Sequence, residues 1–258
     1  GSYHDLLGRL RLPPEVGPQP ARPAAVSTDD LESALRDVLA YLRAQTGRDF
    51  SYYKRATIVR RMARRMSVNG VEDIAGYLAF LRTHPGEAGA LLKDLLISVT
   101  NFFRDRDAFD ALDAQISTLF AGKGGGDEVR VWVPACASGE EAYSIAMLMA
   151  EHARRLDAPP ALQLFATDLD DDAIRAAREG VYPAAIAADV SEERLRRFFN
   201  RDVRGYRVRT ELREAVVFAT HDLLKDAPFS RLDLVSCRNL FIYLAPPAQQ
   251  RALEIVHF

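Results

Sequence analysis

Two acidic side chains stand where a parallel sheet would bind a ligand. Glu140 opens a predicted helix directly after the turn 135–139, and Asp168 closes the next apolar stretch, FATDLD. A carboxylate at a helix start repels a pyrophosphate, whereas a carboxylate at a strand end can accept both hydroxyls of a ribose. A ribose at Asp168 and a cationic group near Glu140, without phosphate, describe S-adenosylmethionine.

Each of these acids also has a purely structural interpretation. Glu140 is a favourable residue in the first turn of any helix, and Asp168 can cap the helix that follows it. The turn lacks the G-x-G-x-x-G spacing of dinucleotide sites, which disfavours an NAD-dependent dehydrogenase but leaves it as a rival. Because both acids stand at adjoining strand ends, the nucleoside site is the preferred hypothesis.

Polar residues follow the third and fourth predicted strands as well. Asp222, in HDLL, is placed to reach the edge of an adenine, and the Asn239–Leu240 backbone is placed to line the opposite wall. Asn239 can equally cap its own loop. Cys136 and Cys237 lie far apart in apolar surroundings, so we expect buried thiols in a reducing compartment, with no disulfide and no metal site.

The sheet that would position these residues begins after GKGGG at 122–126. Apolar runs alternate with helical patterns there, which is typical of a parallel sheet with right-handed crossovers. Strands are expected at Val129–Val133, Leu162–Thr167, Ala215–Thr220 and Leu232–Ser236, with helices at 140–155, 170–179 and 191–199 between them. The stretch 198–212 interrupts this rhythm and predicts a small β-hairpin that turns at Gly205 and projects from the sheet. A last helix is expected from Pro246 to about His257.

Before this sheet the chain is expected to be helical. Helices are predicted from the Ser27–Asp30 cap to near Gly47 and at about 54–67, 71–83, 87–98 and 105–120. We therefore divide the chain into a Pro-rich linker with a tag remnant at 1–26, a helical domain at 27–95 and an α/β domain at 96–258. Four strands make a thin sheet whose last strand would be an exposed edge, so the C-terminal strands of the sheet are expected to be absent from this polypeptide, either by truncation or because another molecule supplies them.

Composition narrows the class of protein. The chain has 258 residues, 48% hydrophobic and 27% charged, with a net charge of −2. These values are ordinary for a globular protein and give no overall attraction to nucleic acid or membrane. The sequence has no apolar run of the about 20 residues that span a bilayer. A cytoplasmic protein is expected.

One stretch is strongly basic. Between Ser51 and Gly70 there are six Lys or Arg residues and no acid. Four arginines recur at helical spacing, namely Arg60, Arg61, Arg64 and Arg65, beside a packing stripe of Ile58, Met62 and Met66. Two interpretations of these arginines remain: a solvated helix face, or a docking surface for an acidic partner. Nucleic-acid binding is disfavoured because interleaved aromatic residues are lacking.

Four segments in order resemble a known family. SVTNFFRDRDAF, PACASGEEAYSIAM, FATDLD and SCRNLFIYL resemble the signature segments of CheR-type chemotaxis receptor methyltransferases, over about residues 30–258. The wording of 53–66 and 230–244 is most similar to forms embedded in fusions with a methylesterase and sensor domains. The resemblance implies a class I, Rossmann-like S-adenosylmethionine-dependent methyltransferase domain with a hairpin insertion, preceded by an all-α domain. It further implies methyl transfer to glutamate side chains of chemoreceptors, with S-adenosylhomocysteine as the product.

The resemblance also implies roles for single residues. Positions that close over the cofactor and face the substrate correspond to Ser98, Thr100 and Arg104, and further cofactor contacts correspond to Glu140, Asp168, Asp222, Leu223, Asn239 and Leu240. The family more often has Asn where this chain has Ser98. The four arginines would dock on the acidic helical bundle of a receptor. The short hairpin tip, RDVRGYR, points to a member that does not depend on a receptor peptide.

The expected chemistry is simple. A substrate glutamate, with a pKa of about 4.3, is ionised at neutral pH, so methyl transfer needs no general base. The planar fork of Arg104 suits the positioning of that carboxylate, and Tyr243 is placed either to assist at the methyl group or to pack in the core. The alternative function is a non-catalytic module that binds S-adenosylmethionine or S-adenosylhomocysteine and regulates other domains of a longer signalling polypeptide.

Overall fold

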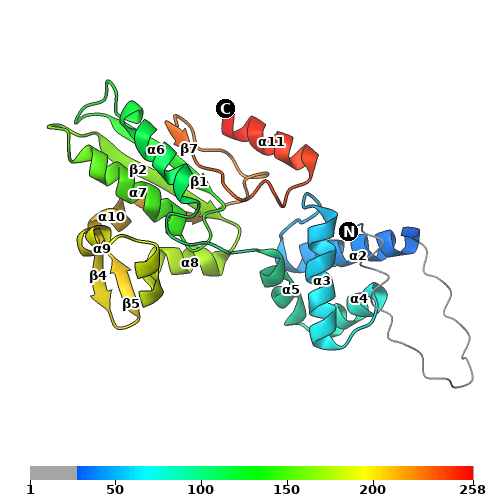
Figure 1. The fold of residues 1–258 in the computed structure, drawn as a ribbon. Helices are drawn as coiled ribbons and strands as arrows, with labels where there is room; N and C mark the ends of the chain where they lie inside the picture. Colours follow the sequence, from blue (N-terminus) through cyan, green and yellow to red (C-terminus); the bar gives the residue numbers. More distant parts are fainter. Residues whose placement is uncertain (1–27, 258) are drawn as a thin grey trace, which may run out of the picture.

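A computed structural model describes residues 28–257 of the chain. The linker predicted for 1–26 lies outside the described residues. Figure 1 shows a group of helices, α2 to α5, set beside an α/β part, with the segment after α5 joining the two. None of the helices within 28–257 is long and apolar enough to cross a membrane.

The helical part consists of α2 (Thr28–Thr46), α3 (Arg55–Asn69), α4 (Ile74–Thr83) and α5 (Glu87–Leu95). They pack around an apolar core that includes Leu42, Met62 and Leu81, each at most 1% exposed. Helix α5 ends three residues before the predicted position, because Leu96 turns extended with ψ 95°. The segment 96–100 is therefore free to run to the sheet as an extended connection.

The predicted parallel sheet is confirmed. β1 (Glu128–Pro134), β2 (Ala161–Asp168), β6 (Val216–Thr220) and β7 (Leu234–Val235) are all parallel and lie in the order β6-β2-β1-β7. The chain builds outward from β1 through β2 to β6 and then returns to the other side of β1. This reversal of strand order creates a switch point beside β1, where open α/β sheets bind ligands at the carboxyl ends of their strands.

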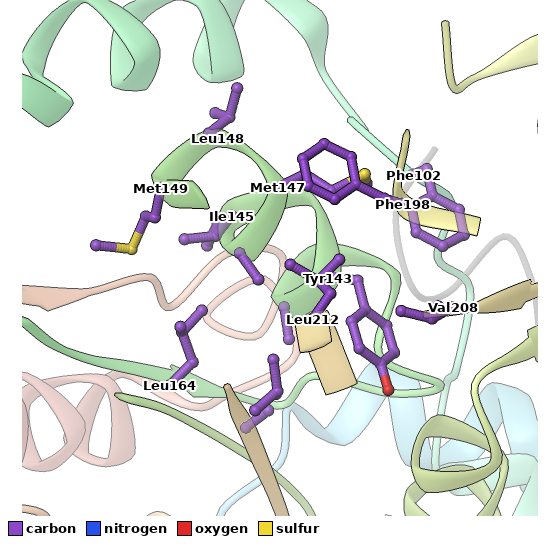
Figure 2. Packing of buried hydrophobic residues seen from close by; sticks show 14 of the residues in the cluster. Phe102, Tyr143, Ile145, Met147, Leu148, Met149, Leu164, Phe198, Val208 and Leu212 are labelled. Atoms are coloured by element: carbon purple, nitrogen blue, oxygen red, sulfur yellow. The ribbon is translucent and has the colours of Figure 1, made fainter. Parts of the chain in front are cut away.

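Helices cover both the sheet and its edge. They are α6 (Arg106–Leu119), α7 (Glu140–Ala153), α8 (Asp171–Glu179) and α11 (Pro246–His257). Every residue of α7 from Ala142 to Met149 is buried, which is the mark of a helix enclosed on all sides. Figure 2 shows its side chains among Leu164 of β2 and Phe102 of the connecting segment, within one apolar cluster.

The predicted hairpin belongs to a separate three-stranded sheet, which corrects the expectation of a simple projection over 198–212. β4 (Phe199–Asp202) and β5 (Gly205–Val208) pair with the two-residue strand β3 (Val181–Tyr182) in the order β3-β5-β4. Gly205 has φ +136°, and a Cβ there would lie 2.6 Å from the Ala184 nitrogen, so this close approach requires glycine. The elements around this sheet are η1 (Ala184–Ala188), α9 (Glu192–Phe198) and α10 (Thr210–Glu214).

Candidate functional site

A cleft lies at the carboxyl ends of the strands, where the helical part meets the sheet. Its empty space, the open mouth included, is about 1150 Å³. Loops after β1, β2, β6 and β7 form one wall. Asp49, Tyr52, Tyr53 and the segment 95–100 close it from the helical side.

This cleft is lined by most of the site residues that were predicted from the sequence. They are Ser98, Thr100, Arg104, Asp168, Asp222, Leu223, Asn239, Leu240 and Tyr243. These residues come from the connecting segment and from three different strand ends, so the fold brings together positions that are up to about 145 residues apart. Their contacts with a cofactor stay predictions.

Asp168, the last residue of β2, presents a half-buried and well-oriented carboxylate. Its two oxygens accept hydrogen bonds from the backbone N–H groups of Ala137, at 2.8 Å, and Asp170, at 2.9 Å. Burial raises the pKa of Asp168, although these backbone bonds act in the opposite direction. The structural alternative for this residue is not what we find, because Asp170 caps α8 by accepting from the Asp172 and Ala173 backbones.

The loop after β1 holds strained backbone next to this carboxylate. Ala135 and Ala137 have φ of +57° and +47°, a left-handed conformation that costs energy for residues with a Cβ. In this conformation the Ala137 N–H reaches Asp168. Asn239, on the loop after β7, also has a positive φ, +58°, which asparagine tolerates better than most residues. Backbone strain thus gathers on both sides of the cleft.

The prediction for Glu140 needs correction. Glu140 is not among the residues that line the cleft, and its carboxylate accepts the Ser138 hydroxyl at 2.8 and 3.0 Å within the turn before α7. The next residue, Glu141, lines the cleft instead. Successive helix residues point about 100° apart, so only one of two adjacent glutamates can face the ligand side.

Glu141 sits in a polar network at the cleft wall. Its carboxylate accepts the Ser236 hydroxyl at 2.6 Å and lies 3.4 Å from an Arg238 Nη. Burial raises the pKa of Glu141, against the lowering effects of Ser236 and Arg238. A carboxylate held in this way is a candidate acceptor for an ammonium group.

Arg238 and Arg104 form the cationic side of the cleft. Arg238 donates to the Arg104 carbonyl at 2.6 Å, pairs with Asp105 at 3.0 Å and lies over the Phe109 ring. The Arg104 guanidinium donates to the Val99 carbonyl at 2.6 Å. Both guanidinium groups are thereby positioned by neighbours from the stretch 99–105.

The loop after β6 forms another part of the cleft wall and is stabilised by the side chain of Asp222. The Asp222 carboxylate accepts the Leu224 N–H at 3.0 Å and lies 3.5 Å from Lys225 Nζ. Leu223, next to it, is 7% exposed and packs with the cluster around Trp132. This loop therefore offers the cleft one acid and one apolar surface, the combination that an adenine edge and face would use.

Backbone hydrogen bonds and ion pairs join the helical part to the α/β part. An antiparallel bridge pairs Tyr53 with Leu244, and the Lys54 N–H donates to the Tyr243 carbonyl at 2.7 Å. The segment 48–93 also supplies two cations to the first turn of α8. Arg48 pairs with Asp171 at 3.4 Å, and Lys93 pairs with Asp172 at 2.6 Å.

The four arginines predicted to dock on a partner all lie in α3 but do not share one environment. Arg60 and Arg64 are exposed, and Arg61 is half-buried. Arg65 turns inward, where it donates to both oxygens of Glu87 at 2.6 and 2.9 Å, and Tyr77 donates to the same carboxylate at 2.6 Å. The prediction that Arg65 belongs to an outward-facing patch is therefore wrong, because its charge is already neutralised inside the helical part.

Both cysteines of the chain are free. Cys136 is buried, and burial followed by the charge of Asp168 raises its pKa. Cys237 is half-buried, and burial raises its pKa to about 12. Both side chains are therefore thiols at neutral pH, as the sequence predicted. Within 28–257 no three acidic, His or Cys side chains gather in a group that could hold a metal.

Among the cleft residues that the sequence did not predict are Glu141, Arg238 and Tyr53. Glu141 lies in a helix that is apolar and buried on all sides, so no periodicity marks its cleft face. Arg238 stands in the quoted segment SCRNLFIYL and was available as a candidate, since its neighbour Asn239 was selected. Tyr53 is about 115 residues from Asp168, and no local pattern predicts their approach.

Comparisons with known proteins match both parts of the chain. The family model described as "CheR methyltransferase, SAM binding domain" matches residues 98–257, and the one described as "CheR methyltransferase, all-alpha domain" matches 33–96. An uncharacterized 104.1 kDa protein of Rhodobacter capsulatus, from the hypE 3' region, is 42% identical over 240 residues, which are 92% of this chain and 25% of that protein.

Two relatives carry functional names. The chemotaxis protein methyltransferase of Escherichia coli K12 is 34% identical over 227 residues, 84% of this chain and 75% of that protein. Chemotaxis protein methyltransferase 2 of Pseudomonas aeruginosa is 33% identical over 217 residues, 81% of this chain and 75% of that protein. The chain thus spans about a quarter of the first relative and three quarters of the other two.

Proposed function

Because this chain belongs to the CheR methyltransferase family, we propose that it transfers a methyl group from S-adenosylmethionine to glutamate side chains of chemoreceptors. The family assignment supports the cofactor and the reaction class, and the names of the relatives support chemoreceptors as substrates. The observation that carries the proposal is the half-buried Asp168 carboxylate at the end of β2, with Glu141 and Asp222 lining the same cleft.

The residues of the cleft fit a cationic nucleoside. Asp168 is oriented by two backbone N–H groups and can accept the ribose hydroxyls. Leu223 and Leu240 offer apolar surface to a base, and Asp222 offers an acceptor to its amino edge. Glu141 can accept the ammonium of the amino-acid part. The N-terminus of α7 carries two glutamates, which disfavours a pyrophosphate there.

The proposed reaction requires little chemistry from the side chains of the cleft. When bound, S-adenosylmethionine supplies an electrophilic methyl group, which would pass to a glutamate oxygen and leave S-adenosylhomocysteine. The substrate carboxylate is ionised at neutral pH, so no side chain has to remove a proton. The chain has to bring this carboxylate into line with the methyl group and to exclude water.

Arg104 is the proposed positioning residue for the substrate carboxylate. Its guanidinium donates one Nη to Val99, which leaves other N–H groups of the fork for a ligand at the cleft mouth. Tyr243 lines the same cleft and is proposed to assist at the methyl group. Water would be excluded by the helical part, which closes the cleft through the bridge between Tyr53 and Leu244.

The proposed receptor-docking surface is the outer face of α3, with Arg60 and Arg64 as its exposed cations and Arg61 at its margin. An acidic helical bundle would be attracted by this surface, chiefly through the rate of encounter. Arg65 is excluded from it by its pairing with Glu87. We also propose that the chain acts within a longer signalling polypeptide, as its similarity to a quarter of the R. capsulatus protein would fit.

A labelled-methyl assay tests the function. Purified protein is incubated with methyl-labelled S-adenosylmethionine and receptor cytoplasmic fragments, and base-labile label on the receptor is counted. We expect label on glutamate side chains and none on fragments whose candidate glutamates are changed to alanine. Cofactor binding without methyl ester would favour the non-catalytic regulatory module. Stabilisation by NAD but not by S-adenosylhomocysteine in a thermal-shift comparison would favour a dehydrogenase.

A further inference from the structure

Tyr53, in the segment just before α3, lies where two apolar cores meet. Its ring packs against the core of the helical part and also against the cluster that contains Trp132, Leu223 and Leu244. It also stacks in a tilted arrangement with Phe50, with ring centroids 5.0 Å apart. The ring is therefore fixed from both sides, and its position depends on the helical part being seated on the sheet.

The phenol of this fixed ring lies within the influence of two carboxylates of the cleft. Tyr53 lines the cleft together with Asp168 and Asp222. Burial, followed by the negative charges of Asp168 and Asp222, raises the pKa of the Tyr53 phenol. The phenol therefore stays protonated and remains a donor. Within residues 28–257 we find no partner for this hydroxyl.

A ribose at Asp168 would need such a donor. The Asp168 carboxylate can only accept hydrogen bonds, so each ribose hydroxyl that binds it donates its single O–H to the carboxylate. The ribose oxygen then faces the cleft as an acceptor, and a buried acceptor without a partner costs free energy. The Arg104 N–H groups that do not bond to Val99 are assigned to the substrate carboxylate, and Arg238 pairs with Asp105. Tyr53 is a neutral donor on the Asp168 side.

We propose that the Tyr53 hydroxyl donates a hydrogen bond to a ribose hydroxyl oxygen of the bound nucleoside, so that the helical part supplies a cofactor-binding residue. This inference rests on the proposed function, because it adds a residue to the same cofactor site. It also ties cofactor binding to domain closure, since the hydroxyl reaches the ribose only while Tyr53 pairs with Leu244.

The test is a calorimetric cycle on the full chain. Wild type, Tyr53→Phe and the control Tyr41→Phe are titrated with S-adenosylhomocysteine and with its 2'-deoxy and 3'-deoxy analogues. Tyr41 belongs to the same helical part, but its hydroxyl bonds to the Leu81 carbonyl, away from the cleft. Loss of one neutral hydrogen bond corresponds to an affinity about three- to tenfold weaker.

We expect Tyr53→Phe to bind S-adenosylhomocysteine about three- to tenfold more weakly than wild type does, and Tyr41→Phe to bind it like wild type. For one of the two deoxy analogues, the loss of affinity relative to S-adenosylhomocysteine should be smaller in Tyr53→Phe than in wild type, by the same factor. Equal binding by Tyr53→Phe and wild type would overturn the inference. So would an equal loss for all three ligands, or a wild type that is indifferent to both ribose hydroxyls. A wild type that does not bind S-adenosylhomocysteine would instead overturn the proposed function.

Discussion

The Ser236 hydroxyl donates a hydrogen bond to the Glu141 carboxylate at 2.6 Å, and this contact joins the loop after β7 to the first turn of α7. Ser236 directly follows β7 and Glu141 belongs to the helix that follows β1, so the contact lies at the switch point of the sheet. The contact fixes which of two consecutive glutamates belongs to the cleft. Glu140, one position earlier, is held by Ser138 inside its own turn.

The first prediction separates the two glutamates. We expect Glu141→Gln to weaken S-adenosylhomocysteine binding by about 1–3 kcal/mol, because a charged partner of the ligand's ammonium is lost. Glu140→Gln is the matched control and should change the affinity by less than about 0.5 kcal/mol. Isothermal titration calorimetry measures both. A larger loss in Glu140→Gln than in Glu141→Gln would restore the sequence-based assignment.

The second prediction concerns pH. Burial raises the pKa of Glu141 above the ordinary value of 4.5, so its negative charge is lost at a higher pH than for an exposed glutamate. Affinity for S-adenosylhomocysteine should therefore fall as the pH is lowered, with a midpoint above 4.5. The fall should be smaller in Glu141→Gln, which has no charge to lose. Identical pH profiles of the two proteins would show that Glu141 does not contact the ligand.

The sequence predicted the sheet well, and for a physical reason. Buried parallel strands are short apolar runs, so β1 and β2 were placed within one residue of their observed bounds. The strand-end position of Asp168 followed directly from that pattern. β3 was missed because Val181–Tyr182 is too short for an alternation to show. The predicted hairpin included residues 210–212, but these belong to the helix α10.

The cleft was predicted less completely, because its walls come from distant parts of the chain. Residues that directly follow strands could be found from local pattern. Glu141 could not be distinguished from Glu140, since α7 has no exposed face to set its orientation. Tyr53 and Arg65 were misjudged for a similar reason: their surroundings are set by Leu244 and Glu87, and local spacing carries no information about these tertiary contacts.

The third prediction tests the inward pairing of Arg65. The Arg65 and Glu87 side chains are 19% and 6% exposed, so removal of the arginine leaves a buried carboxylate without its partner. Arg65→Ala should lower the free energy of unfolding by about 3–5 kcal/mol. Arg64→Ala, whose side chain is 64% exposed, should change it by no more than about 0.5 kcal/mol. Urea unfolding followed by circular dichroism measures both.

The same pair has a pH signature. Burial alone would raise the pKa of Glu87, but the hydrogen bonds from Arg65 and Tyr77 and the Arg65 charge outweigh it, and the pKa is lowered below 4.5. A lowered carboxylate pKa contributes stability that is present above the ordinary pKa and is lost as the pH falls through the folded-state value. The difference between wild type and Arg65→Ala should therefore shrink in acid. A difference that is constant with pH would argue against the pair.

The fourth prediction tests the outer face of α3. The double variant Arg60→Glu/Arg64→Glu should slow methylation of receptor fragments severalfold at low salt, because encounter with an acidic partner is disfavoured, and the effect should fade at high salt. Affinity for S-adenosylhomocysteine should be unchanged. Arg251→Glu on α11, whose side chain is 63% exposed, serves as the control. Equal slowing by the control would indicate a general charge effect instead of a docking surface.

The most direct test of the whole account is a calorimetric titration of the wild type and of Asp168→Ala with S-adenosylhomocysteine. We expect the wild type to bind at one site per chain and Asp168→Ala to bind about 1–3 kcal/mol more weakly, since the ribose loses its charged acceptor. Asp168→Asn, which keeps the side-chain shape, should lie between the two. Unchanged affinity in Asp168→Ala, or a wild type that takes up NAD and not S-adenosylhomocysteine, would contradict it.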